Sequence, residues 1–219
     1  MSILSRLKTV FLGGSSQTAI RSSSLPKVQQ SVVQAAVKDQ HTVRLNRQTN
    51  KIEPGIECYN FHGTGSQISA IPDDFNVHHR LDLKGCKLLS SLPAGLSVPS
   101  IDLSSCISVQ QLPNAMRVTF LNLTNCGSLN ALPDDLRIHG GILNLKNCSN
   151  LNKLPDNMGE VAGLNLNGCS GISALPVGLT VTSWIDITGT RITDIPAEYA
   201  HLGFRHGDKV ISAEAALAM

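Results

Sequence analysis

A Leu-Pro or Ile-Pro pair recurs along the chain at an almost constant interval. Successive prolines of these pairs are separated by 21, 20, 20, 22, 21 and 20 residues. A chance pattern would not keep this phase over seven copies, so the chain is built from repeats that stack on one another. The seven prolines are Pro72, Pro93, Pro113, Pro133, Pro155, Pro176 and Pro196.

The full repeat reads L-x-L-x-x-C-x-x-L-x-x-L-P-x-x-L. L-x-L has the period of two that places both apolar side chains on one face of a short strand. The following Asn/Gly-Cys turns the chain inward, and the proline prevents a long helix on the return path. Residues 59–75 are a degenerate copy that we align with one extra residue, and residues 185–199 are one residue shorter before the proline. The five regular copies begin at Leu81, Ile101, Leu121, Leu143 and Leu164.

One such unit cannot bury its own apolar face, but stacked neighbours share a continuous core and pair their strands in one parallel sheet. The repeat resembles that of the leucine-rich repeat family over roughly residues 56–200. The resemblance implies an α/β-type solenoid with a concave parallel β-sheet and short irregular or 3-10 segments on the convex side. We expect about seven units over residues 56–204.

Five of the six cysteines occupy the same position of the repeat, so they should form a ladder inside the solenoid. Neighbouring rungs would lie about 4.8 Å apart, which requires local distortion for a disulfide. We therefore expect free structural thiols, with a disulfide or a metal site as alternatives, and Thr64 and Thr190 in the equivalent slots of the outer copies. Reduced thiols suit a cytosolic environment. Cys58 stands outside the ladder, which consists of Cys86, Cys106, Cys126, Cys148 and Cys169.

The residues between and after the two strand leucines should point out of the sheet. Every member of the central column is Asn or Asp, which fits either acceptors for a partner or a fixed part of the repeat template. Lys84 and Lys146 belong to the next column, after His62, and we include both in the candidate binding face. The central column reads Asn60, Asp82, Asp102, Asn122, Asn144, Asn165 and Asp186.

The column before the first leucine contains Phe120, Ile142 and Trp184. Large apolar side chains on a sheet face are typical of places where partners anchor. Two other interpretations stay open: the ends of the chain cover these side chains, or the register is different.

Charge is unevenly distributed, because residues 1–38 contain five basic and no acidic residues. We expect residues 1–27 to be a disordered leader, either an organellar transit peptide or a secretion signal. Residues 28–55 would cap the repeats, with a short amphipathic helix over Val28–Lys38, and residues 205–219 would form a C-terminal tail. No basic stripe indicates nucleic acid, and no apolar run is long enough for a membrane span.

The leader and the 20- to 22-residue L-P-x-x-L repeats resemble those of bacterial type III secretion effectors of the IpaH/YopM class. Fewer than 20 residues follow the last repeat and they contain no Cys, so the expected relative is one without the ligase domain. The resemblance implies a non-enzymatic protein without cofactors that is secreted into the host cytoplasm and binds a host protein. The alternatives are a substrate-recognition part of a ubiquitin ligase system, or a cytoplasmic, structural or adhesion repeat protein of the bacterium. The sequence does not predict an oligomeric state.

Overall fold

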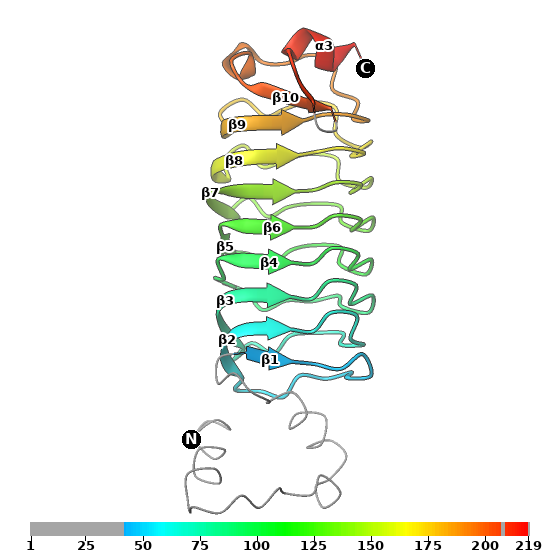
Figure 1. Ribbon diagram of the computed structural model, residues 1–219, viewed down its shortest axis with the longest axis vertical. Coiled ribbons are helices and arrows are strands. Elements are labelled where there is room, and N and C mark those ends of the chain that lie inside the picture. Colours follow the sequence, from blue (N-terminus) through cyan, green and yellow to red (C-terminus); the bar gives the residue numbers. More distant parts are fainter. Residues whose placement is uncertain (1–41, 207–208, 219) are drawn as a thin grey trace, which may run out of the picture.

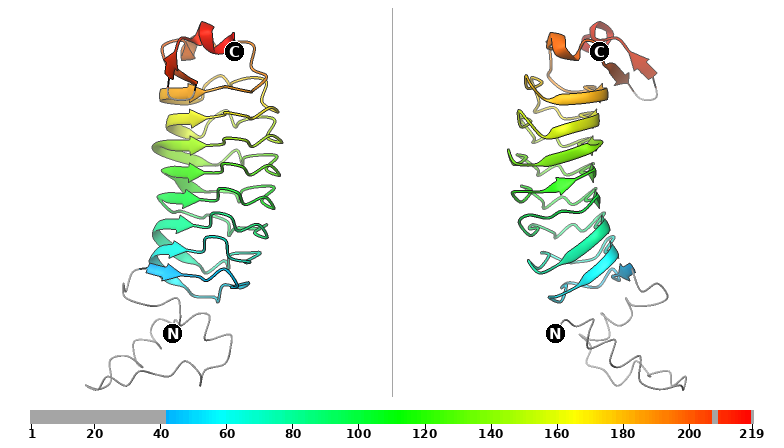
Figure 2. Two further views of the ribbon diagram at one scale, coloured as in Figure 1. Left: turned by 45° about the vertical axis from the view of Figure 1, so that its right-hand side comes forward. Right: turned by 90° about the vertical axis from the view of Figure 1, so that its left-hand side faces the viewer.

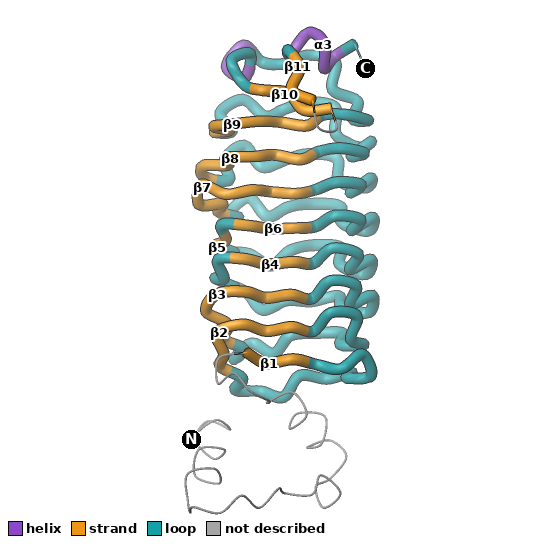
Figure 3. Tube along the Cα trace, viewed as in Figure 1, coloured by secondary structure: helices purple, strands orange, loops and turns teal. Residues whose placement is uncertain are grey.

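Each turn of the chain begins with a short strand whose apolar side chains alternate inward. In the strand around Leu121, this residue and Leu123 are buried while Asn122 between them is half exposed. The computed structural model describes residues 42–206 and 209–218, and in it the chain winds into a parallel β-solenoid of about 8 turns. Figures 1 and 3 show the strands stacked on one side, with the loops that return the chain behind them.

One sheet of 11 strands runs the length of the stack, in the order β1-β2-β3-β4-β6-β7-β8-β9-β10-β11, and β5 pairs with β7 off this path. All neighbours on the path are parallel except β10 and β11. The strands are β1 (Thr42–Arg44), β2 (Glu57–His62), β3 (Asn76–Asp82), β4 (Ser100–Asp102), β5 (Arg117–Val118), β6 (Phe120–Asn122), β7 (Arg137–Asn144), β8 (Gly159–Asn165), β9 (Thr180–Asp186), β10 (Gly203–His206) and β11 (Lys209–Ile211).

Helix is almost absent from the described residues 42–206 and 209–218. It is confined there to a 3-10 helix, η2 (Ala197–Tyr199), and a short α-helix, α3 (Ala213–Leu217), both near the C-terminal end. The return paths between strands are turns and irregular segments, because a proline interrupts each of them. The expected 3-10 segments on the convex side are therefore represented in this part of the chain by η2 alone.

The stacking register places equivalent apolar residues directly above one another. Leu121 pairs with Ile101 on one side and with Leu143 on the other. The same column continues from β2 to β10 and its members are buried, which joins these turns into one core. The column consists of Phe61, Leu81, Ile101, Leu121, Leu143, Leu164, Ile185 and Phe204.

The first described copy of the repeat corrects our alignment. Phe61 pairs with Leu81, so Asn60 lies beside Arg80 and His62 takes the place in the Asn/Asp column that we gave to Asn60. Phe61 is fully buried, whereas Tyr59, which we aligned with the first leucine, is 47% exposed. Phe61 has a large aromatic ring without a polar group, and this ring fills the core. Its burial decides the register of the strand.

A tight turn with left-handed backbone geometry precedes each cysteine. The φ angles at this position are 72° at Gly85, 61° at Ser105, 60° at Asn125, 60° at Asn147 and 75° at Gly168. Glycine and asparagine adopt positive φ more readily than other residues, which explains why they dominate this position of the repeat.

The five ladder cysteines are buried and free. Each thiol donates a hydrogen bond to a backbone carbonyl of the preceding turn, at Sγ–O distances between 2.9 and 3.1 Å. Burial raises the pKa of Cys126 and Cys169 to about 11 and that of Cys106 to about 12, and it also raises those of Cys86 and Cys148. The thiols therefore stay protonated and link one turn to the next.

In the first copy, Ser66 and not Thr64 occupies the cysteine slot. Ser66 is 2% exposed, its backbone N–H donates to Gly63 O, and its hydroxyl lies 3.3 Å from Cys86 Sγ. Our assignment of Thr64 was wrong because the alignment of this copy was shifted. Thr190 does occupy the slot in the last copy, where its N–H donates to Ile187 O.

The two ends of the stack differ from the central turns. The stacked strands begin at Thr42, inside the segment 28–55 that we expected to act as a cap, and the helix expected over Val28–Lys38 lies outside the described residues. At the other end β10 continues the parallel order and β11 turns back antiparallel. The short helix α3 lies at this end of the stack (Figure 2), and Ser212 caps it by accepting a hydrogen bond from Ala215 N.

We predict that Cys126→Ser and Cys126→Ala differ in stability. Serine can keep the hydrogen bond to Leu103 O, and Ser66 shows that a serine fits in the equivalent slot, so the loss of stability should stay below about 1 kcal/mol. Alanine removes the donor and leaves a gap, which should cost about 1–3 kcal/mol. Urea unfolding under reducing conditions measures both changes, and equal losses for the two variants would contradict the role of the thiol as a donor.

Candidate protein-binding surface

The side of the sheet that faces away from the core carries the residues that we selected from the sequence. We call this side the outer face; it comprises the outward residues of the strands from β1 to β10 and the residue two positions after each strand. Because every strand is hydrogen-bonded to both neighbours within this range, the positions on the outer face are fixed relative to one another. It is a rigid platform on which side chains form columns.

Three apolar side chains follow one another along the outer face, and we call them the apolar stripe: Phe120, Ile142 and Trp184. Phe120 is 49% exposed and Ile142 is 36% exposed. The pairing of Leu121 with Leu143 puts Phe120 beside Ile142, about 4.8 Å away along the stack. All three point outward, in the register that the repeat predicts.

Trp184 is fixed by two neighbours and is only half exposed. Its indole lies over Gly163, where an added Cβ would come within 2.5 Å of Cε2. The guanidinium carbon of Arg205 lies 4.1 Å from the centre of the ring, a cation–π contact. The C-terminal hairpin thus covers part of Trp184, one of the interpretations left open, whereas Phe120 and Ile142 remain exposed.

The Asn/Asp column has a structural role that spacing alone did not predict. Six members each accept a hydrogen bond, through Oδ1, from the backbone N–H two residues later, at distances from 2.9 to 3.2 Å. This is an Asx turn, which ends each strand and directs the chain toward the cysteine. The arrangement favours the repeat template over free acceptors for Asp82, Asp102, Asn122, Asn144, Asn165 and Asp186.

Lys84 and Lys146 follow this column, and both are exposed. Their backbone N–H groups donate to Asp82 and Asn144. Both lysines lie at the rim of the outer face. Lys84 lies two residues after β3, and Lys146 lies two residues after β7, the strand that carries Ile142.

A polar and aromatic cluster at the first turns was missed by the sequence reasoning. Tyr59 stacks on His79 with ring centroids 4.9 Å apart and an interplanar angle of 3°, and His78 Nε2 lies 3.3 Å from Glu57 Oε1. His79 Nδ1 lies 3.2 Å from Asn60 Oδ1. The adjacent His pair and the tyrosine one turn earlier were the available signal, but only the corrected register brings them together.

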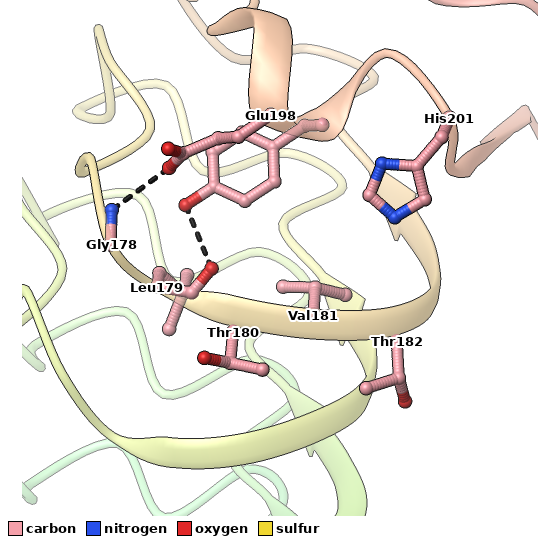
Figure 4. Close-up of a pocket in the computed structure, with 8 residues that line it drawn as sticks. Gly178, Leu179, Thr180, Val181, Thr182, Glu198 and His201 are labelled. Carbon is pink, nitrogen blue, oxygen red and sulfur yellow. Dashed lines mark hydrogen bonds between the residues drawn. The ribbon is translucent and has the colours of Figure 1, made fainter.

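A hollow with a volume of about 500 Å³ lies where η2 meets the preceding turn (Figure 4). The Tyr199 hydroxyl donates to Pro176 O at 2.6 Å and Leu179 O at 2.9 Å, and burial raises the pKa of Tyr199. The backbone N–H of Gly178 donates to Glu198 Oε1 at 2.8 Å. The polar groups of this hollow attach the last turn to the stack.

Within residues 42–206 and 209–218, no three His, Cys, Asp or Glu side chains lie together as a metal-ion site would require. No helix in the same ranges has the length and apolar character needed to cross a membrane.

Comparison of the chain with protein-family models, with curated proteins and with solved structures found no match.

We predict that Gly163→Ala displaces the indole of Trp184. The new methyl group would overlap the ring, and Gly163 does not have a positive φ, so the clash and not backbone strain is the cause. Because Trp184 is the only tryptophan, its emission should shift to longer wavelength and iodide should quench it more strongly.

Gly127→Ala is the matched control, because a Cβ at Gly127 would meet no atom within 4 Å and its φ is not positive. It should leave the emission unchanged. Unaltered fluorescence of Gly163→Ala would show that the indole does not lie over this glycine.

Proposed function

We propose that this protein is a non-catalytic interaction module of the leucine-rich repeat class, which binds a protein partner through the outer face of its sheet. The observation that carries the proposal is the exposed apolar stripe. Phe120 and Ile142 expose 49% and 36% of their surface side by side on a rigid platform. Large apolar and aromatic residues in such positions commonly supply most of the energy of protein association.

The size and rigidity of the outer face support this proposal. The nine parallel strands from β1 to β10 span about 38 Å at a spacing of about 4.8 Å. A stable interface needs about 800 Å² on each partner, which a face of this length can supply. Since hydrogen bonds and buried rungs already fix the platform, a partner would bind with little loss of backbone entropy.

The assignment to the leucine-rich repeat class rests on the repeat itself. Repeats of 20 to 22 residues with L-x-L strands and an L-P turn stack here as a parallel solenoid. Short repeats of this kind, together with an acid-free, Ser-rich leader, also support the proposal that the protein is a bacterial type III effector of the IpaH/YopM type. Six free, buried thiols are consistent with function in the reducing cytoplasm of a host cell.

The test is affinity capture from a eukaryotic cell lysate with the full chain as bait. We expect a protein partner to be retained by the wild-type chain and reduced at least about tenfold with Phe120→Ser or Ile142→Ser, which is typical of an anchor residue. Both substitutions replace exposed side chains, so thermal unfolding should change little.

The matched control is Val177→Ser, since Val177 is 74% exposed but lies in a turn away from the sheet. This variant should capture the partner as well as the wild type does. Equal capture by wild type and the two stripe variants would refute the outer face as the binding surface.

A further inference from the structure

Most of the exposed charged side chains around the apolar stripe are basic. Arg80 precedes Phe120 by two strands in the same column, and Arg205 lies over Trp184 at the opposite end. Lys146 lies two residues after the strand that carries Ile142. Arg137 is half-buried, and the exposed basic residues of the outer face are Arg44, Arg80, Lys84, Arg117, Lys146 and Arg205.

Two of the five acidic residues in the strands of the same face, Glu57 and Glu160, are exposed, and the other three are less accessible. Asp186 is 6% exposed and Asp102 is half-buried, and the side chain of Asp82 is 17% exposed. Each of the three carboxylates accepts a backbone N–H in its Asx turn. The six exposed basic residues outnumber the two exposed carboxylates, so the charge that an approaching molecule meets first is mainly positive.

Arg80 keeps donors available for a partner. Its Nη2 lies 3.8 Å from Asp82 Oδ2, a loose ion pair on an exposed side chain. An arginine has five N–H donors, so one contact of this kind leaves most of them free. Asp82 is also approached by His62 at 3.6 Å and accepts a bond from the Thr64 hydroxyl at 2.9 Å, which further reduces its hold on Arg80.

We propose that the partner offers an acidic segment with a large apolar side chain at its centre. This inference rests on the proposed function and specifies the chemistry of the partner. The apolar side chain packs on Phe120 and Ile142, and carboxylates on either side pair with Arg80 and Arg205. These arginines lie six strand steps apart, about 29 Å, which an extended segment of about nine residues spans.

Charge argues against two other occupants. Residues 1–38 of the chain itself carry five basic and no acidic residues, so the exposed cations repel them. A nucleic acid carries a phosphate at every nucleotide, so several phosphates would lie over the uncharged apolar stripe between Arg80 and Arg205. An acidic protein segment meets the cations at the rim and puts its apolar group on the stripe.

The probe is a library of random 12-residue peptides displayed on phage and selected against the full chain. We expect the enriched peptides to be net negative with at least one large apolar residue. Their binding to Arg80→Glu or Lys146→Glu should fall at least tenfold and weaken with salt, since ion pairs are screened. Lys153→Glu, the same charge change at an exposed position off the sheet, should bind as wild type.

The peptide selection distinguishes failure of the acidic-partner inference from failure of the proposed function. Enriched peptides without acidic character that depend on Phe120 but not on Arg80 would overturn the acidic partner and leave the interaction module standing. Peptides indifferent to Phe120→Ser, or no enrichment at all, would overturn both.

Two parallel measurements address the other occupants. A 20-nucleotide single strand of DNA that binds more tightly than the selected peptides, and loses binding in Arg80→Glu, would overturn an acidic protein partner. Sedimentation that shows a dimer of the chain, with loss of this dimer in Phe120→Ser, would also overturn an acidic protein partner. We expect no such DNA binding and no such dimer.

Discussion

The vertical alignment of buried side chains between successive turns holds this structure together. No single turn encloses its own apolar residues, and Leu121 is buried because Ile101 and Leu143 lie on either side of it. Each buried aliphatic side chain contributes about 1.5–3 kcal/mol when removed from water. The contribution is available only if neighbouring turns have nearly equal length, which explains the narrow range of proline intervals.

Two kinds of polar contact keep the turns in this alignment. The Asx turns end the strands at one height, and the cysteine thiols bond to carbonyls of the preceding turn, for example Cys126 to Leu103 at 3.1 Å. Because the Asx turns use the Asn and Asp side chains in turn after turn, few polar groups remain free in the centre of the outer face. The apolar stripe and the exposed basic residues are then the features that distinguish one position of the face from another, and they define the partner that we propose.

Much of the fold could be predicted from the sequence, because the repeat encodes the core in a fixed phase. The strands of the five regular copies, the inward leucines and the outward direction of Phe120, Ile142 and Trp184 follow from alternation and spacing alone. The first copy was misaligned since Tyr59 and Phe61 both fit an apolar position, and only packing shows that Phe61 enters the core. Consensus matching cannot decide between two aromatic residues that lie two positions apart.

The environment of the candidate site was harder to predict, because it depends on contacts between residues distant in the sequence. Arg205 covers Trp184 because it lies in the C-terminal hairpin, whose strands do not follow the repeat. The stack of Tyr59 on His79 joins two turns in the corrected register. The Asx turns, by contrast, have a local signature, an Asn or Asp at each strand end, that could have been recognised.

The alignment of the turns is tested most directly by the accessibility of the thiols. The intact, reduced protein would be treated with N-ethylmaleimide at pH 7.5, with and without denaturant, and weighed by mass spectrometry. All six cysteines are buried, and burial raises the pKa of Cys58, Cys126 and Cys169 to about 11, so the native chain should gain no adduct while the unfolded chain gains six. Rapid modification of the native protein at the five ladder cysteines would contradict the stacked core.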